Sequence, residues 1–429
     1  MVAQTRATKS RMESATAGSA LPAKETARLD QLTSLRFFAA MMIVMLHATG
    51  SFGVQKSALT LNQGVAFFFV LSGFILTYVY PRLDSAPAVR AFYRARIARI
   101  WPAHAACFLI GFLLIPYAWN TETGVANLLL VHAWIPQSRF YFSYNDVSWS
   151  VSTELFFYIA FPLLVHKLES TWRIKIAAAA MLVIAILCVV NVMHLPAYGS
   201  PASDDLGRLV TSNGLLYANP LARLFEFVGG MCIALAWRSS SAVSRGVAAA
   251  TAIEIAAVLF CLASLLYLNP LATLGRDFLG DAGAAWLGHS GSVLAFGAMI
   301  FVFAKGQGAV SRLMTLPVLV LLGEISYSCY LIHHILLYTY HANAAKFAHV
   351  PDAAAFSIFL VVLFLASYLL WALVEMPGRR LLAGRRTIHG TPAMRRSWRV
   401  FLRPSRPLFA GIALFLVLSM VRTMAATNG

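Results

Sequence analysis

Eleven long apolar stretches run through this sequence, and they constrain the fold more than any other feature. A helix needs about 20 apolar residues to cross the hydrocarbon core of a bilayer, and most of the stretches have that length. Within each stretch the apolar residues follow one another and do not alternate with polar residues, which disfavours a transmembrane β-barrel. The sequence therefore predicts an all-α, polytopic transmembrane helical bundle, with about ten core helices and one extra C-terminal span. The stretches lie near residues 32–53, 62–80, 102–118, 149–166, 174–194, 220–237, 248–268, 285–304, 317–341, 354–376 and 408–424.

The composition excludes several other classes of protein. Apolar residues make up 59% of the 429 residues and charged residues 12%, whereas soluble domains are about half apolar and about a quarter charged. A soluble enzyme, a disordered protein and a nucleic-acid-binding module are therefore excluded, although the formal net charge is +17. We attribute that charge to Arg and Lys in loops that stay in the cytoplasm.

The charges of the loops predict the orientation of the chain. With a cytoplasmic N-terminus every inside loop is net positive, and the loop over 377–407 holds nine arginines and no acidic residue. Cytoplasmic loops retain Arg and Lys in this way. We expect a disordered cytoplasmic tail over 1–29 rather than a signal peptide, a transmembrane domain over 30–376, and the Arg-rich loop. A C-terminal span over 408–429 follows, for which a helix lying on the membrane is the alternative.

The cysteines and the other metal-ligating residues give no sign of a metal centre or a disulfide framework. All five cysteines fall in apolar stretches, and no CxxC pair occurs. We interpret them as buried free thiols that act as small hydrophobic residues. They are Cys107, Cys188, Cys232, Cys261 and Cys329.

The first apolar stretch contains two ionisable residues, Arg36 and His47. A charge inside the bilayer costs about 2.5–3.5 kcal/mol on insertion scales, so it needs a partner or a function. The two residues are eleven apart, which places them on one helix face, about 16 Å apart along the axis. A snorkelling arginine and a hydrogen-bonded core histidine are the plainer interpretation of each alone. The shared face favours a common site.

Arg96 and Arg99 stand at the end of the predicted inside loop before the third stretch. They share a face if this segment is helical, and a guanidinium suits phosphate because it can donate two hydrogen bonds at once. Ordinary positive-inside charge beside an interfacial Trp101 is the alternative. The functional interpretation is a cytoplasmic anion site for a phosphorylated donor.

The fourth stretch opens with Trp149, Ser150 and, in its second turn, Glu154. Ser148 is a plausible helix cap, and the helix dipole favours a carboxylate near a helix start, which is a purely structural interpretation. However, Glu154 is predicted at nearly the depth of His47. A carboxylate that fixes a histidine tautomer is a usual arrangement for a general base.

Polar residues also occur in the ninth and second stretches. Those of the ninth would either form hydrogen bonds between helices or line a site. In the second, the small pair Ser72-Gly73 permits close helix packing, with a site-lining role as the alternative. The residues of the ninth stretch are Ser326, Tyr327, Tyr330 and His334.

At these residues the sequence resembles the acyltransferase-3 family of integral membrane O-acyltransferases. No single motif is specific to the family. The order of the motifs and their positions relative to the spans are specific, and the resemblance covers roughly residues 30–380. The motifs are Arg36 and His47 with ten residues between, Phe-Phe-x-x-x-Ser-Gly-Phe around Ser72, Arg96-x-x-Arg99 before Pro102, Trp149-Ser150 before Glu154, Ile325-Ser326-Tyr327 with Tyr330-Leu331 and a following His, and Glu375-x-Pro377.

The resemblance implies a bundle of about ten helices in the inner membrane of a bacterium that uses cytoplasmic acyl-CoA to acylate a hydroxyl group. In family terms His47 is the essential histidine, Arg36 is its partner, and Arg96 and Arg99 engage the donor. Acceptors in the family are often surface polysaccharides or their lipid-linked precursors. Some members add a periplasmic hydrolase-like domain, which is not expected here.

The predicted mechanism combines the residues and the resemblance. Acyl-CoA, expected to carry acetyl, is a substrate and not a permanently bound cofactor. Arg36, Arg96 and Arg99 hold it, while His47, oriented by Glu154, acts as general base on the acceptor or carries the acyl group briefly. No GxSxG nucleophile and no metal-ligand set is visible, so direct transfer is the simpler scheme. The residues predicted to line the substrate site are Ser72, Trp149, Ser150, Ser326, Tyr327, Tyr330 and His334.

Three alternatives remain at this point. The acceptor is a small molecule or an antibiotic rather than a carbohydrate. Alternatively, the protein is a proton-coupled transporter or flippase in which His47, Glu154 and His334 form a relay, although no internal repeat is evident. A structural scaffold would leave the charges within the spans unexplained.

Overall fold

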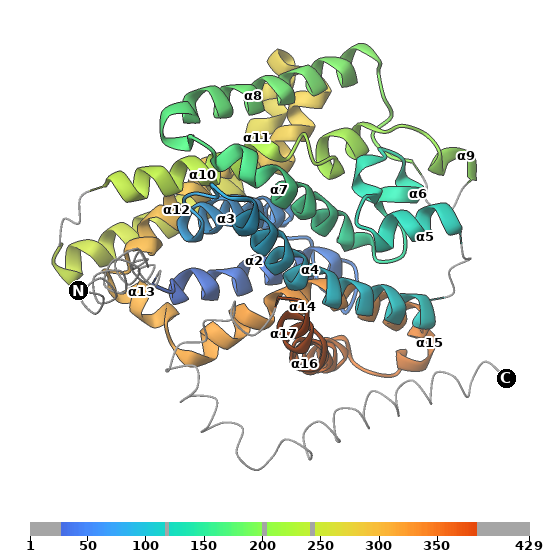
Figure 1. Cartoon of the computed structure of the whole chain (residues 1–429). Coiled ribbons are helices and arrows are strands. Elements are labelled where there is room, and N and C mark those ends of the chain that lie inside the picture. The colour runs from blue at the N-terminus through green and yellow to red at the C-terminus, as the bar shows by residue number, and fades with distance from the viewer. Residues whose placement is uncertain (1–26, 116–119, 200–203, 241–244, 384–429) are drawn as a thin grey trace, which may run out of the picture.

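The computed structural model describes residues 27–115, 120–199, 204–240 and 245–383. Within them the chain is a helical bundle with no regular strand, and eight helical segments are long and apolar enough to cross a membrane (Figure 1). The predicted all-α polytopic bundle is therefore confirmed. The segments contain α2 (Asp30–Ala48), η1 (Leu61–Gln63) with α3 (Gly64–Val79), α4 (Ala86–Leu114), η3 (Asp146–Ser148) with α7 (Trp149–Val165), α8 (Leu168–Val192), α11 (Val247–Ser290) with α12 (Val293–Lys305), α14 (Pro317–Ala342), and α16 (Asp352–Leu370) with η5 (Trp371–Glu375) and α17 (Met376–Ala383).

Two of the predicted spans take a different form in the structure. The sixth becomes α10 (Leu224–Ser239), a shorter helix that packs along α3. The seventh extends far beyond residue 268, because α11 continues until the chain kinks at Gly280, whose φ of 68° suits glycine. The predicted eleventh span over 408–424 and most of the N-terminal tail lie outside the described residues.

Helix α4 corrects the predicted loop before the third span. The helix begins at Ala86 because the Ser85 side chain accepts a hydrogen bond from the Ala88 N–H, and Pro87 in the first turn presets a helical φ. Arg96 and Arg99 therefore lie within a helix, one turn apart, and not in a loop.

Glycine contacts bring the central helices together. A Cβ added at Gly73 of α3 or at Gly230 of α10 would lie 2.0 Å from a backbone oxygen of the other helix. A Cβ at Gly323 of α14 would lie 2.0 Å from the Thr33 carbonyl oxygen of α2. Each position therefore requires glycine for the helices to approach so closely, and Gly73 has the packing role that the sequence analysis considered.

Short elements between the long helices pack at the two ends of the bundle, with α13 at the end opposite α5, α6, α9 and α15 (Figure 1). Ser148, which the sequence analysis interpreted as a helix cap, does not bond the first turn of α7; its hydroxyl contacts the Asn127 and His132 side chains. Burial lowers the pKa of His132 to about 3, so its ring is neutral there. The short elements are α5 (Thr121–Leu128), η2 (His132–Trp134), α6 (Ser138–Tyr141), α9 (Asp204–Gly207), η4 (Gly214–Ala218), α13 (Ala309–Met314) and α15 (Ala344–Phe347).

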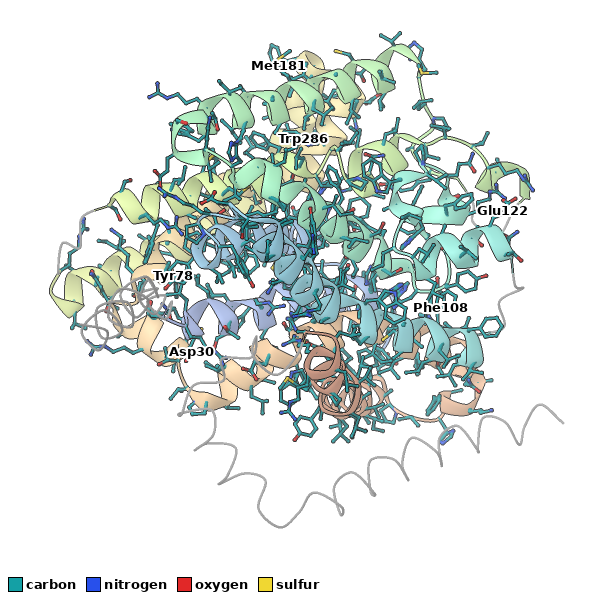
Figure 2. The ribbon with its side chains drawn as sticks, in the orientation of Figure 1. Asp30, Tyr78, Phe108, Glu122, Met181 and Trp286 are labelled. Carbon is teal, nitrogen blue, oxygen red and sulfur yellow. The ribbon has the colours of Figure 1, made fainter. Side chains whose placement is uncertain are left out.

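Helix α8 lies at the edge of the bundle, where Met181 points away from the other helices (Figure 2). Cys188 on this helix is exposed and Cys232 of α10 is only partly buried, which corrects the prediction that all five thiols are buried. Such outward apolar side chains are those that lipid tails would contact in a membrane.

Candidate active site

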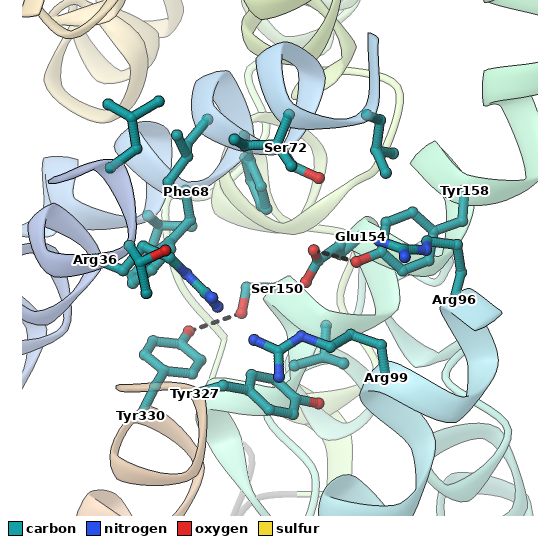
Figure 3. A pocket seen from close by; sticks show the side chains of 18 residues that line it. Arg36, Phe68, Ser72, Arg96, Arg99, Ser150, Glu154, Tyr158, Tyr327 and Tyr330 are labelled. Atoms are coloured by element: carbon teal, nitrogen blue, oxygen red, sulfur yellow. Dashed lines mark hydrogen bonds between the residues drawn. The ribbon is translucent and has the colours of Figure 1, made fainter. Parts of the chain in front are cut away.

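A cavity of about 190 Å³ opens between α2, α3, α4, α7 and α14 (Figure 3). Its α3 wall is mostly apolar and aromatic, and its other walls carry charges and hydroxyl groups. The structure brings the three arginines of the predicted donor site, Arg36, Arg96 and Arg99, to this one cavity, which we call the arginine cavity. It is also lined by Glu154 and, among the residues predicted to contact substrate, by Ser72, Ser150, Tyr327 and Tyr330.

The Arg36 guanidinium points into the arginine cavity, toward Ser150 (Figure 3). Among the residues that the structure describes, no direct hydrogen bond or ion pair holds it, and Glu154 and Glu375 act on its charge only from a greater distance. A guanidinium inside a bilayer without a partner is costly. This group therefore favours a bound anion or another strong acceptor in the cavity.

Arg99 is held in a different way, by the carboxylate of Glu375 at the end of η5. Glu375 is wholly buried and also accepts hydrogen bonds from Arg379 and, at 2.8 Å, from the Ser328 hydroxyl. In the sequence, Glu375 stands out only as part of the Glu375-x-Pro377 motif. An acidic residue at the end of an apolar stretch was the signal that would have singled it out.

Glu154 does not meet His47, and the prediction that it orients this histidine is wrong. Its carboxylate accepts a hydrogen bond from the Tyr158 hydroxyl, one turn along α7, and lines the arginine cavity near Arg96 (Figure 3). The physical reason is that α7 turns this face toward the arginines of α4. The contacts of His47 come instead from α14.

His47 lies in a second polar cluster with His333 and His334, which we call the histidine layer. His47 Nδ1 is 2.8 Å from His333 Nε2, and His333 Nδ1 is 2.7 Å from the Tyr330 carbonyl oxygen. The carbonyl only accepts, so Nδ1 of a neutral His333 carries the proton and its Nε2 accepts from His47 Nδ1. A neutral His47 then has an unprotonated Nε2, as a general base requires.

The other side of the histidine layer is acidic. The His334 ring centroid lies 4.6 Å from that of His47, and His334 Nδ1 is 3.7 Å from Asp146 Oδ2. The Tyr338 hydroxyl donates to the same carboxylate at 2.9 Å. Of His333, His334 and Asp146, only His334 is predicted from the sequence. The other two are not, because only the rotation of α14 tells which ring bonds His47.

The arginine cavity and the histidine layer meet at Tyr330. The Tyr330 hydroxyl is 2.7 Å from Ser150 Oγ at the cavity wall, while its carbonyl binds His333. His47 itself is not among the residues lining the cavity. The common site of Arg36 and His47 that their shared helix face favours is thus divided at this tyrosine.

Two residues predicted to contact substrate lie elsewhere. Trp149 is buried, with its ring centroid 4.2 Å from that of Tyr217. The Ser326 hydroxyl donates to the Gly323 carbonyl within α14 at 2.7 Å. Both have packing roles in the structure. In the described part of the chain, no cluster of three or more His, Cys, Asp or Glu side chains is placed to hold a metal ion.

Comparison with known proteins assigns the chain to a family. The family model for an acyltransferase domain, Acyl_transf_3, matches residues 29–374. The chain belongs to the acyltransferase-3 family. Acyltransferase MdmB of Streptomyces mycarofaciens is 30% identical over 403 residues, which cover 85% of this chain and 95% of that protein. O-acetyltransferase OatA of Staphylococcus aureus is 22% identical over 330 residues, 71% of this chain and 50% of OatA. No solved structure matches.

Membership of the acyltransferase-3 family makes the protein a multi-pass membrane O-acyltransferase, as the sequence predicts. An acyltransferase needs an acyl donor and a hydroxyl acceptor. The arrangement of side chains around His47 suggests how a proton is removed from that hydroxyl. It also leads to a prediction about His333.

Replacing His333 with leucine is expected to lower kcat by about 100-fold, a typical contribution of a positioned acid or base. The reason is that His47 loses the acceptor that keeps the proton on its Nδ1. His333→Asn should retain more activity, because an amide can accept from His47 and donate to the Tyr330 carbonyl. Steady-state kinetics with varied donor would check this. A purely structural role would give equal losses in both variants.

Proposed function

We propose that this protein transfers an acetyl group from acetyl-CoA, bound from the cytoplasm, to a hydroxyl of a carbohydrate acceptor, such as a surface polysaccharide or its lipid-linked precursor. The observation that carries the proposal is the arrangement of two polar clusters in series. An arginine-lined cavity with a partnerless guanidinium ends at Tyr330, next to a histidine whose Nε2 is free to take a proton.

The charges around the arginine cavity favour an anionic donor. Four arginines, three lining the cavity and Arg379 beside it, face two carboxylates, Glu154 and Glu375. The excess of two positive charges inside a membrane bundle is costly without an anion. The diphosphate that joins the pantetheine arm of coenzyme A to its nucleotide carries that charge and suits guanidinium groups.

The arginine cavity and the histidine layer have different roles in the proposed reaction. The pantetheine arm extends from the arginines toward Tyr330, which brings the thioester to the histidine layer. His47 Nε2 takes the proton of the acceptor hydroxyl as its oxygen forms the new C–O bond with the thioester carbonyl carbon. The C–S bond breaks, and the departing thiolate takes the proton back from His47, so atoms and charge balance.

The proposal is tested with purified protein in lipid nanodiscs. Wild-type protein should release free CoA from acetyl-CoA when oligosaccharide acceptors are added, whereas a transporter would not. Arg36→Gln should raise the KM for acetyl-CoA about tenfold, which corresponds to one lost charge-assisted hydrogen bond.

The matched control is Arg90→Gln, since Arg90 is exposed on α4 and does not line the cavity. Its KM should stay unchanged. Absence of CoA release with every acceptor would refute the donor and the reaction together. Transfer to small hydroxylated molecules but to no oligosaccharide would refute only the carbohydrate acceptor.

A further inference from the structure

A second cavity, of about 310 Å³, opens at the end of the bundle where α2 begins. It lies between the ends of α3, α7 and α10 and the start of α8. We call it the basal cavity. It is lined by Thr77, Pro81, Arg82 and Asp84, by residues 165–170, and by Leu235 and Arg238.

We propose that the basal cavity binds the nucleotide end of the acyl-CoA donor through its ribose 3′-phosphate. This inference rests on the proposed function, because it assumes that coenzyme A is the donor. The arginine cavity of about 190 Å³ is smaller than the roughly 300–1,000 Å³ that encloses a drug-sized ligand. It can therefore enclose the pantetheine arm but not the nucleotide, which needs a separate site.

The two cavities adjoin each other along the chain. Leu76 of α3 lines the arginine cavity and Thr77 lines the basal cavity. On α7, Tyr158 and Val165 line one cavity each, seven residues and about 10 Å apart along the helix axis. Arg96, in the first cavity, contacts the Tyr80 hydroxyl at 3.4 Å, next to Pro81 of the second. The lining residues on α3 and α7 thus place the basal cavity near the arginine cavity, on the side of Tyr80.

The basal cavity offers cationic groups for a phosphate. Arg82 and Lys167 are exposed at this cavity, and among the described residues no hydrogen bond or ion pair engages their charged groups. Arg238 is fixed by donating to the Thr77 and Tyr78 carbonyls at the end of α3. Three basic side chains thus face two acids, Asp84 and Glu169, which leaves an excess of basic groups before His166 is counted.

The backbone at the α7–α8 turn adds to this charge. Lys167 has φ of 49°, a conformation that is uncommon for a residue with a side chain and that tends to persist where it serves a site. It starts α8, a helix of 25 residues, at the cavity. The partial positive charge of this helix start favours an anion at the same place as the side chains.

The experiment compares three donors: acetyl-CoA, acetyl-dephospho-CoA, which lacks the 3′-phosphate, and acetyl-pantetheine. The double variant Arg82→Gln/Lys167→Gln should raise the KM for acetyl-CoA about tenfold, as expected for two weak, partly solvated charge contacts. The KM for the other two donors should not change. Arg238→Gln, the second variant, should give the same selective increase. Arg173→Gln is the matched control, because Arg173 is an exposed base near the start of α8 that does not line the cavity.

The outcomes separate this inference from the proposed function. If wild-type protein uses none of the three donors, the proposed function fails. If it uses them but the variants raise all three KM values equally, or none, the basal cavity does not bind the 3′-phosphate.

Lipid headgroups carry phosphate too, so nanodiscs of neutral lipid are compared with nanodiscs containing anionic lipid. An effect of the variants that occurs only with anionic lipid assigns the cavity to a headgroup and overturns the inference.

Discussion

Replacing His47 with alanine is expected to lower kcat for acetyl transfer at least 1,000-fold while the protein remains folded in the membrane. His47 is the histidine whose Nε2 is left without a proton by the bond to His333, and loss of a positioned base costs about 100- to 10,000-fold. We expect the fold to tolerate its removal, because the side chain is not fully enclosed in the protein. CoA release and size-exclusion elution of the same preparation measure both effects.

Two controls make this result specific. His349→Ala removes an exposed histidine that does not belong to the histidine layer or line the arginine cavity, and it should retain wild-type activity. His334→Ala removes a ring that contacts His47 but not its Nδ1, and we expect an intermediate loss. Full activity of His47→Ala would contradict the proposed mechanism, and an aggregated His47→Ala preparation would contradict our view of its structural role.

The helical periodicity of the sequence predicted part of this site. Arg36 and His47 were placed on one face of a span because their spacing fixes their angle around a helix. Spacing along one helix does not say which other helix each residue faces. Glu154 was therefore assigned to His47 by depth alone, whereas the rotation of α7 turns it toward Arg96 and the rotation of α14 presents His333.

The division between the arginine cavity and the histidine layer was also beyond the sequence. It depends on Tyr330, which bonds Ser150 through its hydroxyl and His333 through its backbone. A backbone carbonyl leaves no signature in a sequence, because every residue has one. The apolar stretches, by contrast, predicted the bundle well, since a membrane requires their length whatever their neighbours are.

Replacing Glu375 with alanine is expected to lower the free energy of unfolding by about 3–5 kcal/mol, the usual effect of breaking a buried ion pair. The carboxylate has no exposed surface and accepts hydrogen bonds from Arg99, Arg379 and Ser328. Without it, two guanidinium groups lose their partner inside the bundle, and Arg99 is no longer held at the cavity. Thermal unfolding in detergent, together with CoA release, measures the loss of stability and of donor binding.

Graded substitutions distinguish charge from packing at Glu375. Glu375→Gln keeps an acceptor oxygen but not the charge, so it should lose less stability than Glu375→Ala. The double variant Arg379→Gln/Glu375→Gln removes one charge of each sign. It should recover part of the lost free energy of unfolding, because the excess of positive charge around Arg99 is smaller than in Glu375→Gln. Glu122→Gln is the control: this carboxylate is 71% exposed and 3.6 Å from Arg139, and such surface pairs contribute about 0–1 kcal/mol. Equal effects of Glu122→Gln and Glu375→Gln would show that the buried carboxylate is not what holds Arg99 in place.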